Sequence, residues 1–162
     1  QDFSFAVKAA LNDVSIAWLY ETSHDIASRA KRTCRFDDES EGKRLRDTYA
    51  NRVDEEKGVA QIGSPLEAAY WEEWGTGEYA AHGDGRPGWW IYIPDQQSQG
   101  GGKTYATKEE AEEMAAYIRA VHKKEAVVTN GRRPNYTLEK AFKAVGPKAR
   151  AALETKLKEM SG

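Results

Sequence analysis

No proline precedes Pro65 in this chain, and the apolar residues before it recur at the spacing of an α-helix. Steps of four, three and four residues place the first of them on one helical stripe, which later apolar residues extend. The residues of the stripe are Val7, Leu11, Val14, Trp18, Ile26 and Ala30. Lys31, Arg32 and Arg35 lie where cations favour the C-terminal end of a helix dipole. The sequence therefore predicts one long N-terminal helix over residues 5–34, or two helices in series.

Two pairs of β-rich segments are each separated by turn-forming residues. The first pair flanks a charged turn that ends in Gly58, and the second flanks a loop of Gln, Ser and Gly. Each pair predicts a β-hairpin, and one more short strand is expected after them. The predicted strands cover residues 49–53, 59–62, 89–93, 103–106 and 126–129.

A helix with a complete start signal is predicted between the hairpins. Ser64 suits the N-cap, Pro65 suits the first helical position, and Glu67 completes a capping box. The helix should run from Pro65 to about Trp74, where a Gly-Thr-Gly sequence ends it.

Two more helices are predicted in the last third of the chain. Residues 107–110 form a second capping box and open a helix over 108–124. The final helix carries an apolar stripe, and Pro147 is expected to kink or restart it. The residues expected to face the core are Ala111, Met114, Ala115 and Ile118 in the first of these helices, and Leu138, Ala141, Phe142 and Val145 in the second.

These elements predict an α+β fold, in which a long N-terminal helix and a C-terminal helix pack on a small, mainly antiparallel sheet of two hairpins. The length of 162 residues fits a single domain over residues 1–162. Flexible loops are expected near 37–42 and 96–102, because both segments lack apolar residues.

Composition and charge restrict the class of protein. Cys34 is the one cysteine, so disulfide frameworks and paired-cysteine zinc or redox motifs are excluded, and we expect a reduced, semi-buried thiol in an intracellular protein. No apolar run or signal-peptide pattern is present, so we expect a soluble protein with no membrane partner. The net charge of −2 is the sum of −7 for residues 1–130 and +5 for residues 131–162. The chain as a whole therefore lacks the excess of positive charge that is typical of nucleic-acid-binding proteins. The mean hydropathy of −0.79 indicates that the chain completes the burial of its surface in an assembly.

Few residues have the spacing that metal binding or catalysis requires. The histidines lie in different predicted elements, without a second ligand at a metal-binding spacing. They are His24, His82 and His122. Glu72 and Glu73 most resemble an acid–base pair in an apolar setting, but neighbours on a helix point about 100° apart and cannot share one substrate bond. We expect at most one of them to face inward, tied to an Arg or to backbone donors, and we expect no catalytic residue, cofactor or metal.

Aromatic residues are dense between Tyr70 and Tyr92. Trp, Tyr and Arg dominate protein interfaces, whereas base stacking favours interleaved cations, and the neighbours here are Glu and Asp. Arg86 either clamps a carboxylate across an interface or ties its loop to its own helix. The residues expected at an oligomer or partner interface are Trp71, Trp74, Gly75, Gly77, Tyr79, Arg86, Trp89 and Trp90.

The order of several short motifs resembles one protein family over residues 7–160. The motifs are Arg44-Leu45-Arg46-Asp47, Ile62-Gly63-Ser64, Glu73-Trp74-Gly75-Thr76-Gly77, Gly85-Arg86-Pro87-Gly88-Trp89-Trp90, and Pro134-Asn135 leading to Leu138 and Ala141-Phe142. They resemble those of phage neck and minor tail proteins of the lambdoid gene-product-ten type, a tail-completion family related to the lambda Z protein. Relative to that family, residues 108–124 resemble an inserted helix, and residues 131–135 replace a Gln-Pro-Pro-like segment.

The resemblance implies a non-enzymatic virion protein of a phage or prophage, which acts in tail completion or head–tail joining. It implies a homo-oligomeric ring around the DNA passage, with tail-tube or tail-terminator and head-connector proteins as partners. DNA would pass without sequence-specific binding. The protein would lie in the neck or tail of the virion, and in the host cytoplasm during assembly. The unequal charge of the two parts of the chain suits a ring, because the positive end of one copy can meet the negative flank of the next.

Two other classes of function stay open at this stage. A small glycan-binding or hydrolytic enzyme would use Glu72 or Glu73 in an aromatic cleft. A toxin-like or regulatory protein would bind nucleic acid through its basic C-terminal segment, with Arg132, Arg133 and Lys140, and its binding would fall steeply with salt.

Overall fold

The computed structural model describes residues 4–35, 39–40, 43–94 and 102–161. The contacts divide the chain into two compact units. We call residues 1–73 and 136–162 the helical unit and residues 74–135 the sheet unit. The α+β class is confirmed, with a long N-terminal helix and a C-terminal helix. The two predicted hairpins form separate sheets, one in each unit, where the sequence analysis expected a single sheet.

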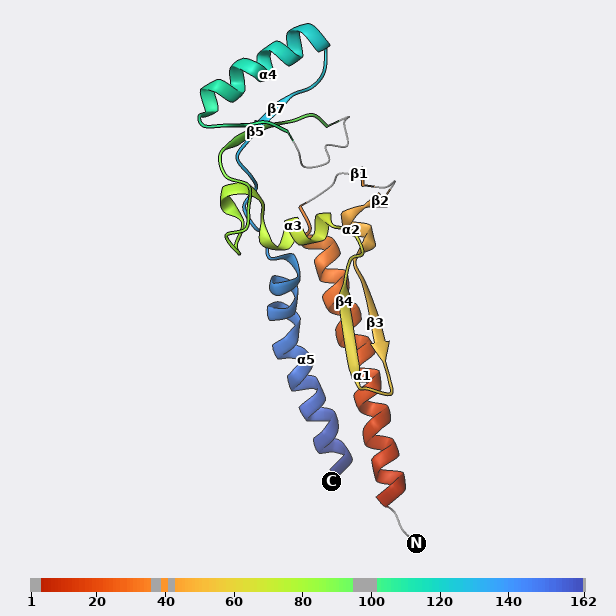
Figure 1. The fold of residues 1–162 in the computed structure, drawn as a ribbon. Helices are drawn as coiled ribbons and strands as arrows, with labels where there is room; N and C mark the ends of the chain where they lie inside the picture. The colour runs from red at the N-terminus through yellow and green to blue at the C-terminus, as the bar shows by residue number, and fades with distance from the viewer. Residues whose placement is uncertain (1–3, 36–38, 41–42, 95–101, 162) are drawn as a thin grey trace. The chain divides into compact units, whose positions relative to one another are not determined.

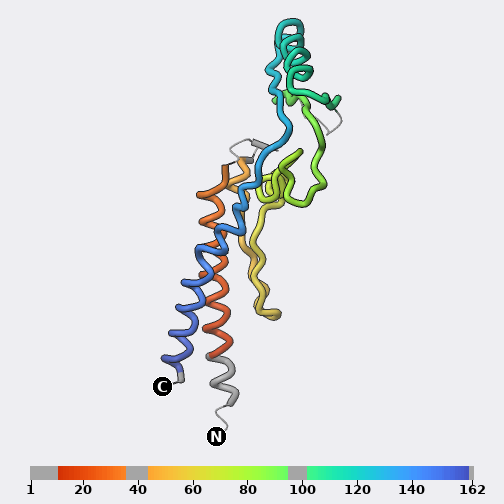
Figure 2. The backbone as a smooth tube through the Cα atoms, turned by 90° about the vertical axis from the view of Figure 1, so that its left-hand side faces the viewer, coloured from red at the N-terminus to blue at the C-terminus, as the bar shows by residue number. Residues whose placement is uncertain are grey.

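Two long helices form the helical unit: α1 (Ser4–Thr33) and α5 (Thr137–Ser161). They lie side by side and antiparallel (Figures 1 and 2). The predicted N-terminal helix is thus confirmed as one helix. The indole N–H of Trp18 donates a hydrogen bond to the carbonyl of Ala149 at 2.7 Å, which joins the two helices midway along their length.

The first hairpin lies against α1 and completes the helical unit. Strand β3 (Ala50–Asp54) pairs antiparallel with β4 (Val59–Gly63), as the charged turn between them predicted. A short helix, α2 (Leu45–Thr48), precedes β3. The core of the unit gathers buried residues from α1, the segments after it and α5: Ile26, Ala30, Cys34, Leu45, Tyr49 and Ala141.

Helix α5 departs from its prediction at two residues. It continues without a break through Pro147, because this residue is exposed and water can satisfy the carbonyl that loses its helical donor. Phe142 was expected in the core but is 61% exposed. The neighbouring Ala141 faces the core, so the side chain of Phe142 points about 100° away from it.

A three-stranded antiparallel sheet forms the centre of the sheet unit. Its order is β6-β5-β7, with β5 (Trp89–Tyr92) between β6 (Thr104–Tyr105) and β7 (Val127–Thr129). All three strands were predicted. Helix α4 (Lys108–His122) packs on this sheet, and the hydroxyl of Thr107 accepts the N–H of Glu110, as the capping box predicted.

The stripe of α4 that faces the sheet is narrower than predicted. Ala111 and Ala115 are fully buried, but Met114, also expected in the core, is 39% exposed. The reason is the size of the sheet, whose three short strands cover only the side of α4 that carries the two alanines.

The helix predicted from Pro65 begins three residues later, as α3 (Ala68–Trp74). The hydroxyl of Ser64 accepts the N–H of Leu66 at 3.1 Å and also lies 2.7 Å from the hydroxyl of Thr48. Ser64 therefore stabilises a turn before the helix and does not cap it.

The two segments predicted as flexible loops are described only in part. Strand β1 (Glu39–Ser40) pairs antiparallel with β2 (Lys43–Arg44), so Glu39 and Ser40 belong to a small hairpin. The rest of 37–42, and 96–102 except Gly102, lie outside the described residues.

Candidate functional site

The Glu72–Glu73 pair on α3 is the densest group of buried acidic side chains that the structure describes. Glu72 is 1% exposed and Glu73 is 6% exposed. The expectation that at most one of them faces inward is therefore wrong. Adjacent side chains of a helix point in different directions, and here each direction leads to hydrogen-bond donors.

Glu73 caps the start of α5. Its Oε2 accepts the backbone N–H of Leu138 at 2.7 Å, and its Oε1 accepts the N–H of Glu139 at 3.0 Å. Its own backbone carbonyl accepts the N–H of Tyr136 at 3.3 Å. The first N–H groups of a helix have no partner within the helix, and the helix dipole favours a negative charge there. Glu73 supplies both the acceptors and the charge.

Glu72 joins the segment after α1 to the start of α5. Its Oε1 accepts the backbone N–H of Arg35 at 2.8 Å and the hydroxyl of Thr137 at 3.0 Å. Thr137 is fully buried. The two carboxylates thus hold together segments that are far apart in the sequence. Backbone donors were one of the two kinds of partner that the sequence analysis expected for a buried Glu.

The Gly-Thr-Gly sequence after α3 forms a close backbone contact within the sheet unit. The N–H of Thr76 donates to the carbonyl of Arg132, and the N–H of Glu78 donates to that of Asn130, both at 2.9 Å. Gly77 has a φ of +61°, and a Cβ there would lie 2.1 Å from the carbonyl oxygen of Asn130. Only glycine fits this position, because of both its φ and its surroundings.

Gly75, two residues earlier, meets the same conditions. Its φ is +77°, and a Cβ there would lie 2.7 Å from the carbonyl oxygen of Arg132 and 2.8 Å from Pro134. The conformations of both glycines thus depend on the segment 130–134, which follows the last strand of the sheet.

Most of the aromatic residues predicted at an interface have contacts inside the sheet unit. The ring of Trp74 lies 4.6 Å from that of His82, and the guanidinium of Arg133 lies 4.9 Å from the centre of the Tyr79 ring. Trp89 and Trp90 are half-buried in β5. Trp71, at the end of the helical unit's part of α3, is 40% exposed. The interface itself stays a prediction.

Arg86 ties its loop to residues at strand β6, and not to a helix as one of the two alternatives above expected. Its Nε donates to the hydroxyl of Thr104 at 2.9 Å, and its guanidinium also donates to the carbonyl of Gly102. The guanidinium lies 5.2 Å from the centre of the Trp90 ring. These contacts connect the glycine-rich loop to the strands β5 and β6.

The described residues contain no group of three or more His, Cys, Asp and Glu side chains that could hold a metal ion. His24 lies 3.4 Å from the hydroxyl of Ser28, and the ring of His122 lies 6.0 Å from that of Tyr117. Cys34, expected to be a semi-buried thiol, is buried at 6% exposed and forms no disulfide. In the part of the chain that the structure covers, no helix is both long enough and apolar enough to cross a membrane.

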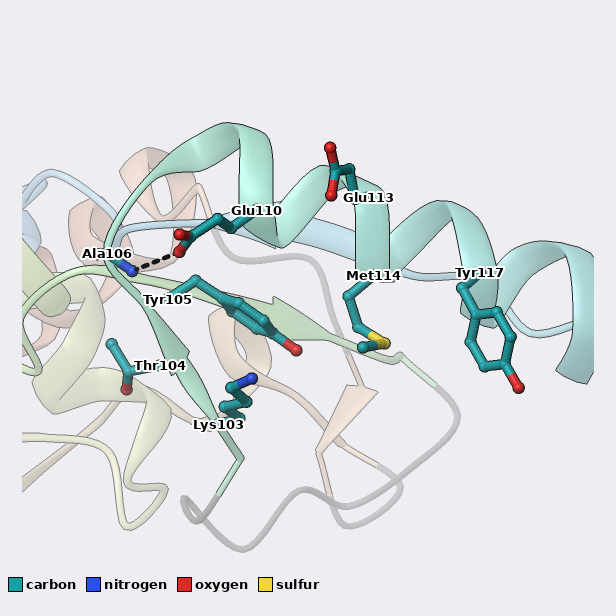
Figure 3. A pocket seen from close by; sticks show the side chains of 8 residues that line it. All are labelled: Lys103, Thr104, Tyr105, Ala106, Glu110, Glu113, Met114 and Tyr117. Atoms are coloured by element: carbon teal, nitrogen blue, oxygen red, sulfur yellow. Dashed lines mark hydrogen bonds between the residues drawn. The ribbon is translucent and has the colours of Figure 1, made fainter.

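Two hollows in the described surface were not found by the sequence analysis. One, of about 430 Å³, lies between α1 and α5 and includes Trp18 and Ala149. The other, of about 480 Å³, lies between β6 and α4 and includes Tyr105, Met114 and Tyr117 (Figure 3). Met114 of α4 was a usable signal, but the sequence analysis assigned it to the core.

Comparisons with protein-family models, with curated proteins and with solved structures give no match for this chain.

Proposed function

We propose that the chain is a structural virion protein of a phage, which acts in tail completion or head–tail joining as a homo-oligomeric ring around the DNA passage. The proposal combines the motif resemblance with one structural observation. The buried apolar side chains that the structure describes are mostly alanines, while larger apolar residues lie at the surface. They include Leu11, Tyr70, Trp71, Tyr117, Val121 and Phe142.

A surface of this kind supports assembly because exposed apolar groups favour burial against another chain. A small core also limits the stability that an isolated subunit can reach. Contacts between copies would bury part of the exposed apolar surface, as the mean hydropathy indicated. The charge asymmetry of the chain supports the same proposal, since unlike charges meet when copies pack head to tail.

The contacts of the Glu72–Glu73 pair favour this proposal over the glycosidase-like alternative. Both carboxylates are buried, and both accept hydrogen bonds from groups at the start of α5. A general acid or nucleophile must reach its substrate, and these two carboxylates are occupied with the backbone instead. The motif that begins at Glu73 therefore has a role in the fold that needs no reaction.

Native mass spectrometry over a series of protein concentrations tests the proposal, with the chain alone and mixed with tail-tube, tail-terminator or head-connector proteins. We expect an oligomer with a fixed number of subunits, or a complex with one of these proteins. A chain that stays monomeric in every mixture would contradict the proposal. Assays of glycan cleavage with the Glu72→Gln and Glu73→Gln variants address the alternative, which requires a large loss of rate from one of them.

A further inference from the structure

The groove between α1 and α5 is lined by small apolar residues of α5 and by basic side chains of both helices. We call the small apolar residues its floor and the basic residues of each helix its walls. The floor is made of small residues of α5, with Trp18 at one side. Arg29 and Arg32 lie on the α1 wall and Lys148 on the α5 wall. The floor residues are Ala144, Val145, Ala149 and Ala152. A floor of this composition leaves room for larger side chains from another molecule.

The basic side chains of the groove lack ion-pair partners within the part of the chain that the structure covers, whereas one acidic side chain is already paired. Glu21, which also lines the groove, lies 3.2 Å from the ammonium group of Lys156. Asp25 is the second carboxylate of the lining. Arg29, Arg32 and Lys148 therefore outnumber the carboxylates left to balance them. The excess positive charge of the groove therefore favours the binding of a partner with negative charge.

The exposed side of α4 carries the complementary features. Glu109, Glu113, Tyr117 and Val121 follow one another at steps of four and form a ridge along the helix, which we call the α4 ridge. Tyr117 and Val121 are each 54% exposed. Both glutamates are exposed, and no described residue forms an ion pair with either of them. Figure 3 shows that the Tyr117 side chain projects away from the axis of α4.

We propose that the α4 ridge of one copy of the chain docks into the α1–α5 groove of a second copy. Tyr117 and Val121 would cover the alanine floor, and Glu109 and Glu113 would lie near the basic side chains of the walls. This is the helix-in-groove mode of recognition, in which a ridge of side chains four residues apart enters a groove of another element. The inference rests on the proposed function, because its partner is a second copy.

The two surfaces are different parts of the chain, so the contact is heterologous. Each copy would offer its ridge to one neighbour and its groove to another. Contacts of this type close into a ring when the rotation between copies divides a full turn. The inference therefore assigns the self-contact of the proposed ring to named residues.

Reversal of charge on each surface tests the contact, with self-association measured by sedimentation velocity over a concentration series. The groove variant carries Arg29→Glu and Lys148→Glu, and the ridge variant carries Glu109→Lys and Glu113→Lys. We expect each variant alone to self-associate at least about tenfold more weakly, because like charges then face each other. An equimolar mixture of the two variants should recover most of the association. In the mixture every groove can find a ridge of the opposite charge.

The matched control carries Glu56→Lys and Glu67→Lys, which change the net charge as the ridge variant does. Both residues are exposed and lie outside the two surfaces. The control should associate like the wild type. Circular dichroism checks the folding of each variant, and Arg29→Gln with Glu113→Gln provides a milder pair if a reversal unfolds the chain. Tyr117→Ala should weaken association by a similar factor without any change of charge.

The outcomes separate this inference from the proposed function. If the wild type forms an oligomer that all of these substitutions leave intact, the inference is overturned and the proposed function stands. The same holds if the substitutions weaken the oligomer but the mixture does not recover it. If the wild type neither self-associates nor binds a tail or connector protein, both are overturned.

Discussion

The side chain of Glu73 accepts the backbone N–H of Leu138 at 2.7 Å, across 65 positions of sequence. The carboxylate thereby caps helix α5 from a neighbouring helix, and a residue outside the helix replaces the usual Ser, Thr, Asp or Asn cap. Tyr136, the residue directly before α5, has a φ of +53° and is not one of these residue types. The position of α5 beside α1 thus depends on a side chain of α3.

Replacement of Glu73 by Gln should destabilise the helical unit by about 1–2 kcal/mol, because the amide keeps one acceptor oxygen but loses the charge. Urea unfolding measures this difference. Hydrogen exchange should show weaker protection at the amides of Leu138 and Glu139. Glu67→Gln, on the exposed turn before α3, is the control and should change stability by less than about 0.5 kcal/mol. Equal stability of the two variants would show that the cap contributes nothing.

Replacement of Gly77 by Ala should destabilise the sheet unit by more than about 3 kcal/mol. The new Cβ would meet the backbone carbonyl of Asn130, and the positive φ adds about 1–2 kcal/mol. Gly58→Ala is the matched control, since Gly58 has a φ of +62° but open space around it. Gly58→Ala should lower the free energy of unfolding by about 1–2 kcal/mol, because only the positive φ is unfavourable there. Thermal unfolding compares the two, and similar midpoints would mean that the close approach is not needed.

Tyr49 should make the folded chain less stable at alkaline pH. Burial raises the pKa of its hydroxyl above the ordinary value of 10.0, and Cys34, Glu72 and Glu73 add to this effect. The folded state therefore holds a proton that the unfolded state releases, so stability is complete below pH 10 and falls as the pH rises above it. Tyr20 acts in the same direction, since its hydrogen bond to Glu55 raises the pKa of its hydroxyl.

The Tyr49→Phe variant isolates the contribution of Tyr49. We expect a smaller loss of stability between pH 9 and 11 than in the wild type, measured by urea unfolding at each pH. At pH 7 its stability should lie within about 1 kcal/mol of the wild type, because no described group forms a hydrogen bond with this hydroxyl. Tyr117→Phe, at an exposed position, should leave the pH dependence unchanged. An unchanged pH profile for Tyr49→Phe would refute the argument.

Replacement of Trp18 by Phe should lower the free energy of unfolding by about 1–2 kcal/mol. The hydrogen bond to the carbonyl of Ala149 is lost, and the smaller ring fills less of the space between α1 and α5. Trp71→Phe, at an exposed position of α3, is the control for a change of the same size. Chemical unfolding of both variants measures the difference. If Trp71→Phe costs as much as Trp18→Phe, the contact between the helices is weaker than the geometry indicates.

Local signals predicted most of the secondary structure. The apolar stripe from Val14 to Ala30 predicted α1, and the capping box at Thr107 predicted the start of α4. Both signals depend on residues three or four positions apart, which the backbone alone brings together. Ser64 failed as a signal because its hydroxyl bonds to Leu66 and lies beside that of Thr48, which is distant in sequence.

Features that depend on distant contacts were predicted poorly. The separation of the two hairpins into different sheets was not visible in their sequences, because either hairpin could have joined a common sheet. Met114 and Phe142 have core-like positions in their helices, but both are exposed. The sheet covers only the alanine side of α4, and Ala141 rather than Phe142 faces the core of the helical unit. The burial of both Glu72 and Glu73 followed from donors at Arg35 and at the start of α5, which lie far away in sequence.

Electron microscopy of the purified chain, at the concentration where it self-associates most, tests the central claim most directly. The account predicts particles that are closed rings with one subunit number and a central opening. Single subunits at every concentration, or open filaments without closed rings, would contradict it.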